Sequence, residues 1–158
     1  MTVEPTTADA RLRAALRAHP FLEGLAPEQI DALLPRARLL DVPAGTLMAR
    51  EGDPADCFHL LLEGRVAIEM QTPMGGPMRL QTVGPGETLG WSWLLSPQRR
   101  QFDLRAVEPA RLVAVDAETA RAACAADREL GFVVLQRLLA VVARRLTATR
   151  LQLLDVYR

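Results

Sequence analysis

The sequence predicts a mainly β domain, a sandwich or barrel of short strands, with helices before and after it. Two observations predict this class. Between residues 38 and 115, short apolar stretches of period two alternate with Gly and Pro, as in short strands joined by tight turns. On both sides of that region, in residues 7–34 and 117–156, apolar residues recur at helical spacing. The length of 158 residues suits one domain, so we expect a single domain over residues 1–158.

Two helices are expected in the N-terminal segment. Thr7 can cap a helix over Ala8–Ala18, and Pro20 ends it. A second, short helix follows Pro27, because Pro is favoured in the first turn. Its apolar face would carry Ile30, Leu33 and Leu34.

About eight strands are expected in the central region. The spacing places Val66, Ile68 and Met70 on one strand face, and Met78, Leu80 and Thr82 on one face of the next, with Arg79 and Gln81 outward. The segment 73–77, rich in Pro and Gly, joins these two strands as a hairpin. Phe102, Leu104 and Ala106, then Leu112 and Ala114, continue the alternation.

The C-terminal segment predicts a short helix and a long one. Asp116 can cap a helix through Ala123, and Asp127 can cap a helix from Arg128 to about Val156. An apolar heptad seam follows the long helix for about 30 Å. The seam consists of Leu135, Leu139, Val142, Leu146, Thr149, Leu153 and Val156.

A second apolar side of this helix is formed by Val133, Val134, Leu138 and Val141. Two apolar sides favour a helix that packs on its own domain with one side and on a second copy with the other, so we expect a homodimer. The alternative, in which the seam simply packs on its own domain, remains open at this point.

Composition excludes several classes of partner. Lys plus Arg and Asp plus Glu both number 19, so the net charge of zero gives no general attraction to nucleic acid or anionic membranes. The sequence contains no signal-peptide pattern and no membrane-spanning apolar run. We therefore expect a cytoplasmic protein without membrane contact. Cys57 and Cys124 do not form a disulfide framework.

No residue pattern indicates catalysis. His19 and His59 lack partners at metal-ligand spacing, and no nucleophile–base pair or phosphate-binding glycine loop occurs. We expect a protein that is not an enzyme, with no catalytic residue, no metal and no cofactor.

Five motifs together resemble the Crp/Fnr-type cyclic-nucleotide-binding domain family. They are His19-Pro20-Phe21-Leu22, Gly45-x6-Gly52-Asp53, Phe58-x5-Gly64, Gly84-Pro85-Gly86-Glu87-x2-Gly90 and Ala143-Arg144-Arg145-Leu146. The resemblance implies a β-roll or jelly roll closed by a long C-terminal helix that forms the dimer interface. It also implies a ligand between roll and helix, and a short phosphate-binding helix after Gly90.

The cassette that would bind the phosphate departs from the family pattern. It comprises Gly90, Trp91, Ser92, Arg99, Arg100 and Gln101. Trp91 replaces the Glu that the family uses for the ribose hydroxyl. Arg100, or Arg99 in a tighter register, corresponds to the phosphate-binding Arg, and Gln101 replaces the Ser or Thr that follows it. Thr149 and Arg150 match the helix region that reaches the base, although a seam Thr and a solvated Arg explain them equally.

The sequence therefore predicts a ligand-sensing regulatory domain with a degenerate cassette, whose ligand is a cyclic nucleotide or another small anion. One alternative is an interaction or regulatory subunit with a protein partner, in which Trp91 and Trp93 fill the pocket. Another is a transcription-regulator fragment without its DNA-binding part. The chain stops about where the hinge would begin, and Arg144 with Arg145 on a solvated face is too small a patch, so we expect no direct DNA binding.

Overall fold

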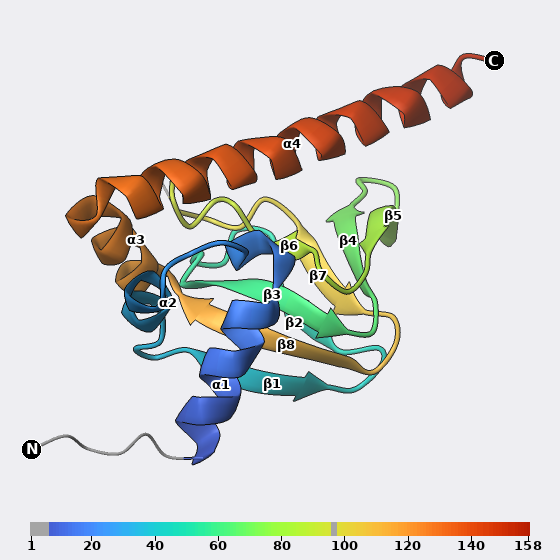
Figure 1. The fold of residues 1–158 in the computed structure, drawn as a ribbon. Helices are drawn as coiled ribbons and strands as arrows, with labels where there is room; N and C mark the ends of the chain where they lie inside the picture. The colour runs from blue at the N-terminus through green and yellow to red at the C-terminus, as the bar shows by residue number, and fades with distance from the viewer. Residues whose placement is uncertain (1–6, 96–97) are drawn as a thin grey trace, which may run out of the picture.

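The computed structural model of the protein describes residues 7–95 and 98–158. The N-terminal elements are α1 (Thr7–Ala18), a 3-10 turn η1 (Pro20–Leu22) and α2 (Pro27–Leu33). The C-terminal elements are α3 (Ala117–Ala126) and α4 (Arg128–Val156). In Figure 1, α2 and α3 lie at one end of the strands and α1 runs in front of them, while α4 crosses over them and projects beyond them at its C-terminal end.

Eight strands lie between the helices and form two four-stranded antiparallel sheets, in the orders β1-β8-β3-β6 and β2-β7-β4-β5. This is the mainly β roll with flanking helices that the sequence predicts. The strands are β1 (Arg38–Val42), β2 (Leu47–Ala49), β3 (Cys57–Glu63), β4 (Val66–Gln71), β5 (Pro77–Val83), β6 (Thr88–Leu89), β7 (Asp103–Ala106) and β8 (Ala110–Asp116).

Two of the three predicted helix caps lie where the sequence puts them, whereas Thr7, expected to cap α1, is the first residue of the helix itself. The Asp116 carboxylate accepts a hydrogen bond from the Thr119 N–H at 2.9 Å and starts α3. The Asp127 carboxylate accepts from the N–H groups of Glu129 and Leu130, each at 3.1 Å, and starts α4. Each carboxylate satisfies N–H groups that have no partner inside the helix.

One tight turn of the roll requires glycine. Gly64, between β3 and β4, has φ of +87°, and a Cβ built on it would lie 2.3 Å from the Pro109 carbonyl oxygen. A side chain is therefore excluded both by the backbone conformation and by the neighbouring loop. This close approach brings the β3–β4 turn against the start of β8.

The strand pattern differs from the simple alternation at three places, one of which is Met78 of β5, expected on the face opposite Arg79 and Gln81 but 45% exposed. Val66 and Ile68 are buried as expected, but Met70 is exposed, because the pairing with β5 shifts register between Ile68 and Glu69. The Gln81 side chain, expected to point outward, contacts the long helix. Its amide donates to the Arg145 carbonyl oxygen on α4 at 3.5 Å, so this side of β5 faces the long helix.

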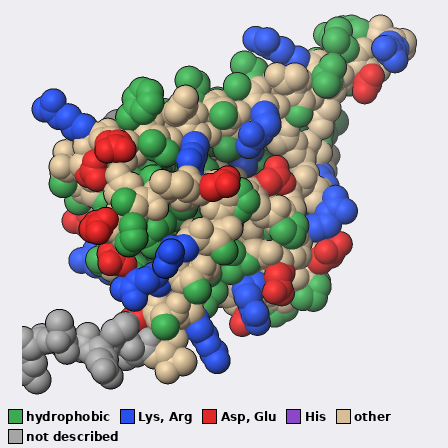
Figure 2. Space-filling view, in the orientation of Figure 1, with side chains coloured by type: hydrophobic (Ala, Val, Ile, Leu, Met, Phe, Trp, Pro, Cys, Tyr) green, Lys and Arg blue, Asp and Glu red, His purple; other side chains and the backbone are tan. Residues whose placement is uncertain are grey.

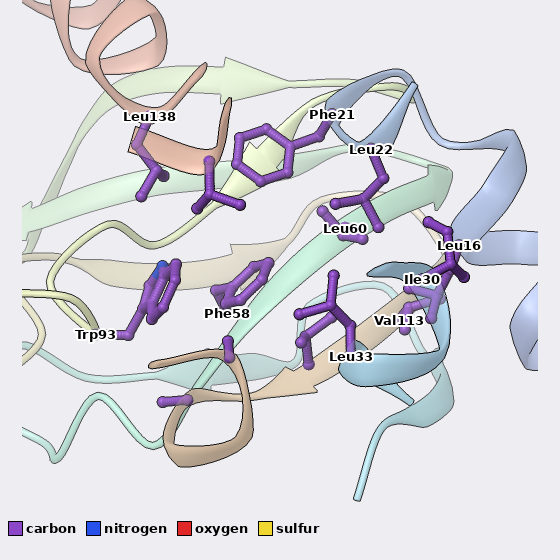
Figure 3. Close-up of a cluster of buried hydrophobic side chains, with 14 of the residues drawn as sticks. Leu16, Phe21, Leu22, Ile30, Leu33, Phe58, Leu60, Trp93, Val113 and Leu138 are labelled. Atoms are coloured by element: carbon purple, nitrogen blue, oxygen red, sulfur yellow. The ribbon is translucent and has the colours of Figure 1, made fainter. Parts of the chain in front are cut away.

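Two apolar clusters hold the structure together. One lies between the two sheets and is aliphatic, with Leu61, Val66, Leu89 and Leu112 among its members. The other lies where the helices meet the end of the roll. Figure 3 shows this second cluster, in which side chains from α1, η1, α2, β3 and α4 converge on one another.

The two sides of α4 differ as the sequence predicts. The inner side, with Leu130, Val134, Leu138 and Val141, is buried against the rest of the chain. All seven seam residues are exposed; Leu139, for example, is 69% exposed. In Figure 2, apolar side chains follow α4 with basic ones between them, and acidic and basic side chains are interspersed over the rest of the visible face. Within the described ranges, no helix combines the length and apolar character needed to cross a membrane.

Candidate functional site

The cassette begins at Gly90, which leaves β6 with φ of +94°. Trp91–Leu95 then form turns, and the Leu94 N–H donates to the Trp91 carbonyl oxygen at 3.4 Å. The short helix that the family resemblance implies is therefore not formed in the described part of the cassette, so that expectation is wrong. The Trp93 ring is buried in the core, whereas Leu95 is exposed, so the chain turns back toward the surface between these two residues.

Trp93 belongs to the apolar cluster at the helical end of the roll. It is 1% exposed, and its ring stacks on Phe58 with centroids 4.6 Å apart and planes 21° from parallel (Figure 3). Its backbone carbonyl accepts from Arg121 of α3 at 2.7 Å. The interpretation of Trp93 as a core side chain fits this position.

Arg100 is the buried arginine of the cassette. It is 7% exposed, and its guanidinium donates to the Cys57 carbonyl oxygen at 3.0 Å. The Cys57 Sγ lies 3.4 Å from the same nitrogen, and an Asp56 carboxylate oxygen lies 3.6 Å away. Arg99 is exposed and donates to the Gly52 carbonyl oxygen at 3.4 Å. Of the two registers, the structure brings only Arg100 to the interior.

A small pocket of about 30 Å³ lies beside Arg100. It is bounded by the cassette, by β4 and β7, and by one residue from α4. Its lining residues are Ile68, Gly90, Trp91, Ser92, Arg100, Gln101, Phe102, Leu104 and Arg145. Five of the six predicted cassette residues thus meet at one place, and Arg99 does not join them.

Arg145 is the lining residue that sequence reasoning missed. It was expected on a solvated face, but its side chain is half-buried and donates to the Thr88 carbonyl oxygen of β6. Burial lowers the pKa of Arg145, and the Glu87 carboxylate opposes that effect. The signal that could have found it is its position four residues after Val141 and seven after Leu138, on the packed side of the helix.

An open groove of about 420 Å³ lies on the other side of Arg145, between α4 and strands β5 and β6. Arg145 lines both the groove and the small pocket. The helix is held across the groove by polar contacts, since the Gln152 amide donates to the Leu80 carbonyl oxygen. Arg145 is therefore the residue that the two spaces share.

Thr149 and Arg150 do not line the small pocket. Both are exposed, and the Thr149 hydroxyl donates to the Arg145 carbonyl oxygen at 2.9 Å within the helix. Gln101 lines the pocket, while its amide nitrogen donates to the Arg99 carbonyl oxygen at 3.1 Å. The two regions expected to share a ligand, the cassette and the Thr149 turn, are not brought together within this chain.

Cys57 and His59 are residues of β3 that lie near Arg100. The Cys57 Sγ and the His59 Nε2 are 3.8 Å apart. Burial raises the pKa of the Cys57 thiol, although the Arg100 guanidinium opposes it. Burial, reinforced by Arg100, lowers the pKa of His59 to about 4. At neutral pH both side chains are therefore uncharged. Nowhere in residues 7–95 and 98–158 do three or more His, Cys, Asp or Glu side chains gather closely enough to hold a metal ion.

Comparison with known proteins gives a consistent result. Residues 39–127 match the model of the cyclic nucleotide-binding domain family. The CRP-like cAMP-activated global transcriptional regulator of Mycobacterium tuberculosis is 29% identical over 136 residues, which cover 86% of this chain and 59% of that protein. The cyclic AMP receptor protein of Thermus thermophilus is 33% identical over 139 residues, covering 87% of this chain and 62% of that protein. The chain spans about three fifths of the length of these two regulators.

The fold comparison agrees. The crystal structure of a protein from Geobacter metallireducens GS-15, provisionally described as cyclic nucleotide-binding, superposes on this chain with a TM-score of 0.73 at 27% sequence identity. The match covers 92% of this chain and 99% of that one. With the family match spanning more than half of the sequence and the whole roll in place, the chain belongs to the cyclic nucleotide-binding domain family, of the Crp/Fnr type.

Proposed function

We propose that this chain is a single cytoplasmic regulatory domain that senses a small anionic ligand between the roll and α4, and that it is not an enzyme. The observation that carries the proposal is the meeting of two arginines at one small pocket. Arg100 comes from the cassette and Arg145 from α4, so a ligand held by both would connect the roll to the helix. Occupancy of the pocket would then bias the position of α4.

The chemistry of the pocket supports an anion. A guanidinium offers several N–H donors in one plane and binds oxyanions through charge-assisted hydrogen bonds. Both arginines are withdrawn from bulk water, where such contacts are stronger than at the surface. Gly90 exposes its backbone beside Arg100, since a Cβ there would lie 3.6 Å from the guanidinium nitrogen.

The same geometry argues against tight binding of an ordinary cyclic nucleotide. Trp91 lines the pocket where the family resemblance implies a ribose-binding Glu, so the sugar would lose a carboxylate acceptor and meet an indole. Losing a hydrogen bond to a charged group costs about 1.5–3 kcal/mol. The pocket of about 30 Å³ is also far smaller than the several hundred Å³ typical of small-molecule sites. A nucleotide would need Arg145 to move aside and join the pocket to the groove.

The output of the sensor, in this proposal, is a homodimer through α4. The seam residues Leu135, Leu139, Leu146 and Leu153 are about half or more exposed, and they repeat at the heptad spacing of a two-helix interface. The buried inner side of α4 already attaches the helix to its own roll, so the exposed seam is not needed for that contact. A second copy is therefore the partner that the exposed seam fits.

A second candidate function is a protein-interaction subunit that binds no ligand. Trp93 favours it, because its fully buried ring fills space at the cassette with apolar contacts. In that case the Arg100 pocket would remain a structural remnant, and α4 or the roll surface would bind a regulatory protein.

Thermal unfolding separates the two candidates. The unfolding midpoint would be measured with cyclic AMP, cyclic GMP and inorganic phosphate in turn, for the wild type, for Arg100→Gln and for Arg99→Gln. A ligand at a hundred times its Kd adds about 2.7 kcal/mol, or about 5–10 °C for a chain of this length. We expect such a shift with at least one anion, lost in Arg100→Gln and kept in Arg99→Gln. No shift with any of the three would reject sensing and favour the interaction subunit.

A further inference from the structure

We propose that the β4–β5 hairpin carries a site for a soft monovalent metal ion, Cu(I) or Ag(I), whose ligands are the thioether sulfurs of Met70, Met74 and Met78. The three residues follow one another at intervals of four in the sequence. None of them lines the pocket beside Arg100, so the site goes beyond the sensing function and does not depend on it.

The pairing of the two strands brings two of the thioethers together. Met70 of β4 is directly opposite Met78 of β5 in the antiparallel ladder. Side chains of directly opposite residues point to the same face of the sheet, and their Cβ atoms lie about 4.5–5.5 Å apart. Because a methionine side chain has three rotatable bonds, the two sulfurs can approach one ion from the two strands.

The turn places the third methionine at the tip of the hairpin. The Thr72 N–H and hydroxyl both donate to the Gly76 carbonyl oxygen, at 3.2 and 2.9 Å, and the Gly75 N–H donates to the Thr72 carbonyl oxygen at 3.4 Å. Pro73 and Met74 are therefore the two central residues of a hydrogen-bonded turn. The Met74 side chain thus lies at the end of the hairpin that the pair adjoins, and its thioether is the third sulfur available to an ion there.

The exposure of these side chains is unusual for the roll. Over the described part of residues 38–116, five large apolar side chains are exposed, and three of them are these methionines. Met70 is 36% exposed, Met78 is 45% exposed and Met74 is 96% exposed. Met48, in contrast, packs against the apolar cluster between the sheets. The hairpin thioethers are therefore open to an ion from solvent, whereas Met48 is a packing residue.

The chemistry of the cluster selects a soft ion. A thioether is uncharged and polarizable, and it favours Cu(I) over the harder divalent ions. His, Cys, Asp and Glu, the ligands that Zn²⁺ or Ca²⁺ would need, do not gather in groups of three anywhere in the described ranges. The sequence-based expectation of no metal concerned those ligand types, and it does not bear on thioethers.

The charged side chains of the two strands point away from the methionine face. Glu69 and Arg79 are next to the two paired methionines along β4 and β5, so their side chains lie on the opposite face of the sheet. There the Arg79 guanidinium lies 4.0 Å from the Glu69 carboxylate. The guanidinium of these strands is therefore directed away from the place where a cation would bind.

Methyl NMR of the full chain tests the proposal. Protein labelled at the methionine methyl groups would be titrated with Ag(I) nitrate in chloride-free buffer, because Ag(I) has the ligand preference of Cu(I) and does not change oxidation state. The variants are Met74→Leu and the matched control Met48→Leu, since leucine replaces methionine at nearly the same volume. Zn(II) is the control ion.

We expect the methyl signals of Met70, Met74 and Met78 to shift together and to saturate at one Ag(I) per chain, while the Met48 signal stays in place. Met74→Leu should weaken Ag(I) binding by about tenfold or more, because removal even of a group that only supports a ligand costs that much in metal affinity. Met48→Leu should leave the affinity unchanged, and equal affinities in the two variants would overturn the proposal.

Three further results would also overturn it. Hairpin methyl signals that titrate independently of one another would mean exposed thioethers without a shared ion. Ag(I) binding that leaves these signals in place would locate the ion at the free thiols of Cys57 or Cys124. An equal response to Zn(II) would show that the hairpin does not select a soft ion.

Discussion

Trp91 and Trp93 stand two residues apart, yet they belong to different regions of the molecule. Trp93 is packed face to face on Phe58 inside an apolar cluster. Trp91 is only partly buried and forms one wall of a pocket that also holds two arginines. The cassette therefore has two halves: one is part of the core, and the other lines a small pocket together with two arginines.

The largest effect is expected from removing the core half of the cassette. Trp93→Ala deletes a fully buried indole and should lower the free energy of unfolding by about 3–5 kcal/mol. Trp91→Ala is the matched control, and because Trp91 is partly exposed its loss should be much smaller. Urea unfolding of both variants measures the two values. Equal losses would remove the distinction between the two tryptophans.

The pocket half can be tested by restoring a carboxylate. Trp91→Glu supplies the acceptor that the family resemblance implies for the ribose, and it removes the indole from the wall. Affinity for cyclic AMP should rise by about tenfold or more, from about 1.5–3 kcal/mol. Affinity for inorganic phosphate should fall, because the new carboxylate would lie beside Arg100 and Arg145. Calorimetry with both ligands checks the prediction, and a change of the same sign for both would contradict it.

Acid should weaken the region behind the pocket. Burial lowers the pKa of His59 from 6.5 to about 4, so the folded state keeps this imidazole neutral while the unfolded chain takes up a proton. The stabilisation is complete above pH 6.5 and is lost as the pH falls from 6.5 toward about 4. Between about pH 7.5 and about pH 5 the loss is about 2 kcal/mol.

Urea unfolding at those two pH values measures the effect. The variant His59→Leu has no imidazole at this position and should show a smaller loss by about that amount. If the two proteins lose the same free energy of unfolding over this range, the imidazole of His59 is not the group responsible.

α4 also has a packed side, which is buried against the roll, and an exposed side, the seam. The smallest effect is expected from a substitution in this seam. Leu139→Ala removes a seam side chain that is 69% exposed in the single chain. If a second copy covers the seam, dimerisation should weaken by about 1 kcal/mol per protomer or more, with little change in monomer stability. Leu151→Ala is the control, since Leu151 is 58% exposed but lies outside the heptad seam. Sedimentation equilibrium should separate the two variants, and identical dimer affinities would argue against the seam.

Much of the fold could be predicted because local signals and global packing agree. Asp116 and Asp127 cap helices that begin at the next residue, and Pro27 opens α2. The predicted turn lies between β4 and β5, although Pro77, expected in the turn, is the first residue of β5 and pairs with Gln71. Such elements depend on near neighbours in the sequence, which a reader of the sequence can see.

The site could be predicted only in part, because it depends on contacts between distant segments. The choice between Arg99 and Arg100 depends on which of the two enters the space beside β3, about forty residues earlier in the sequence. In the sequence, Arg144 and Arg145 look like two solvated arginines. Only the contact between α4 and β6 shows that Arg145 is half-buried. The cassette helix implied by the resemblance is replaced by turns around Trp93, whose burial requires the whole helical cluster.

The most direct test of sensing measures the dimer dissociation constant by sedimentation equilibrium with and without an anion. Inorganic phosphate and cyclic AMP would be added in turn at constant ionic strength, to the wild type and to Arg145→Gln. Because a ligand that contacts both the roll and α4 must couple to the state of the helix, at least one anion should change the constant in the wild type and not in the variant. A dissociation constant that neither anion changes in the wild type would contradict the proposal that this domain is a sensor.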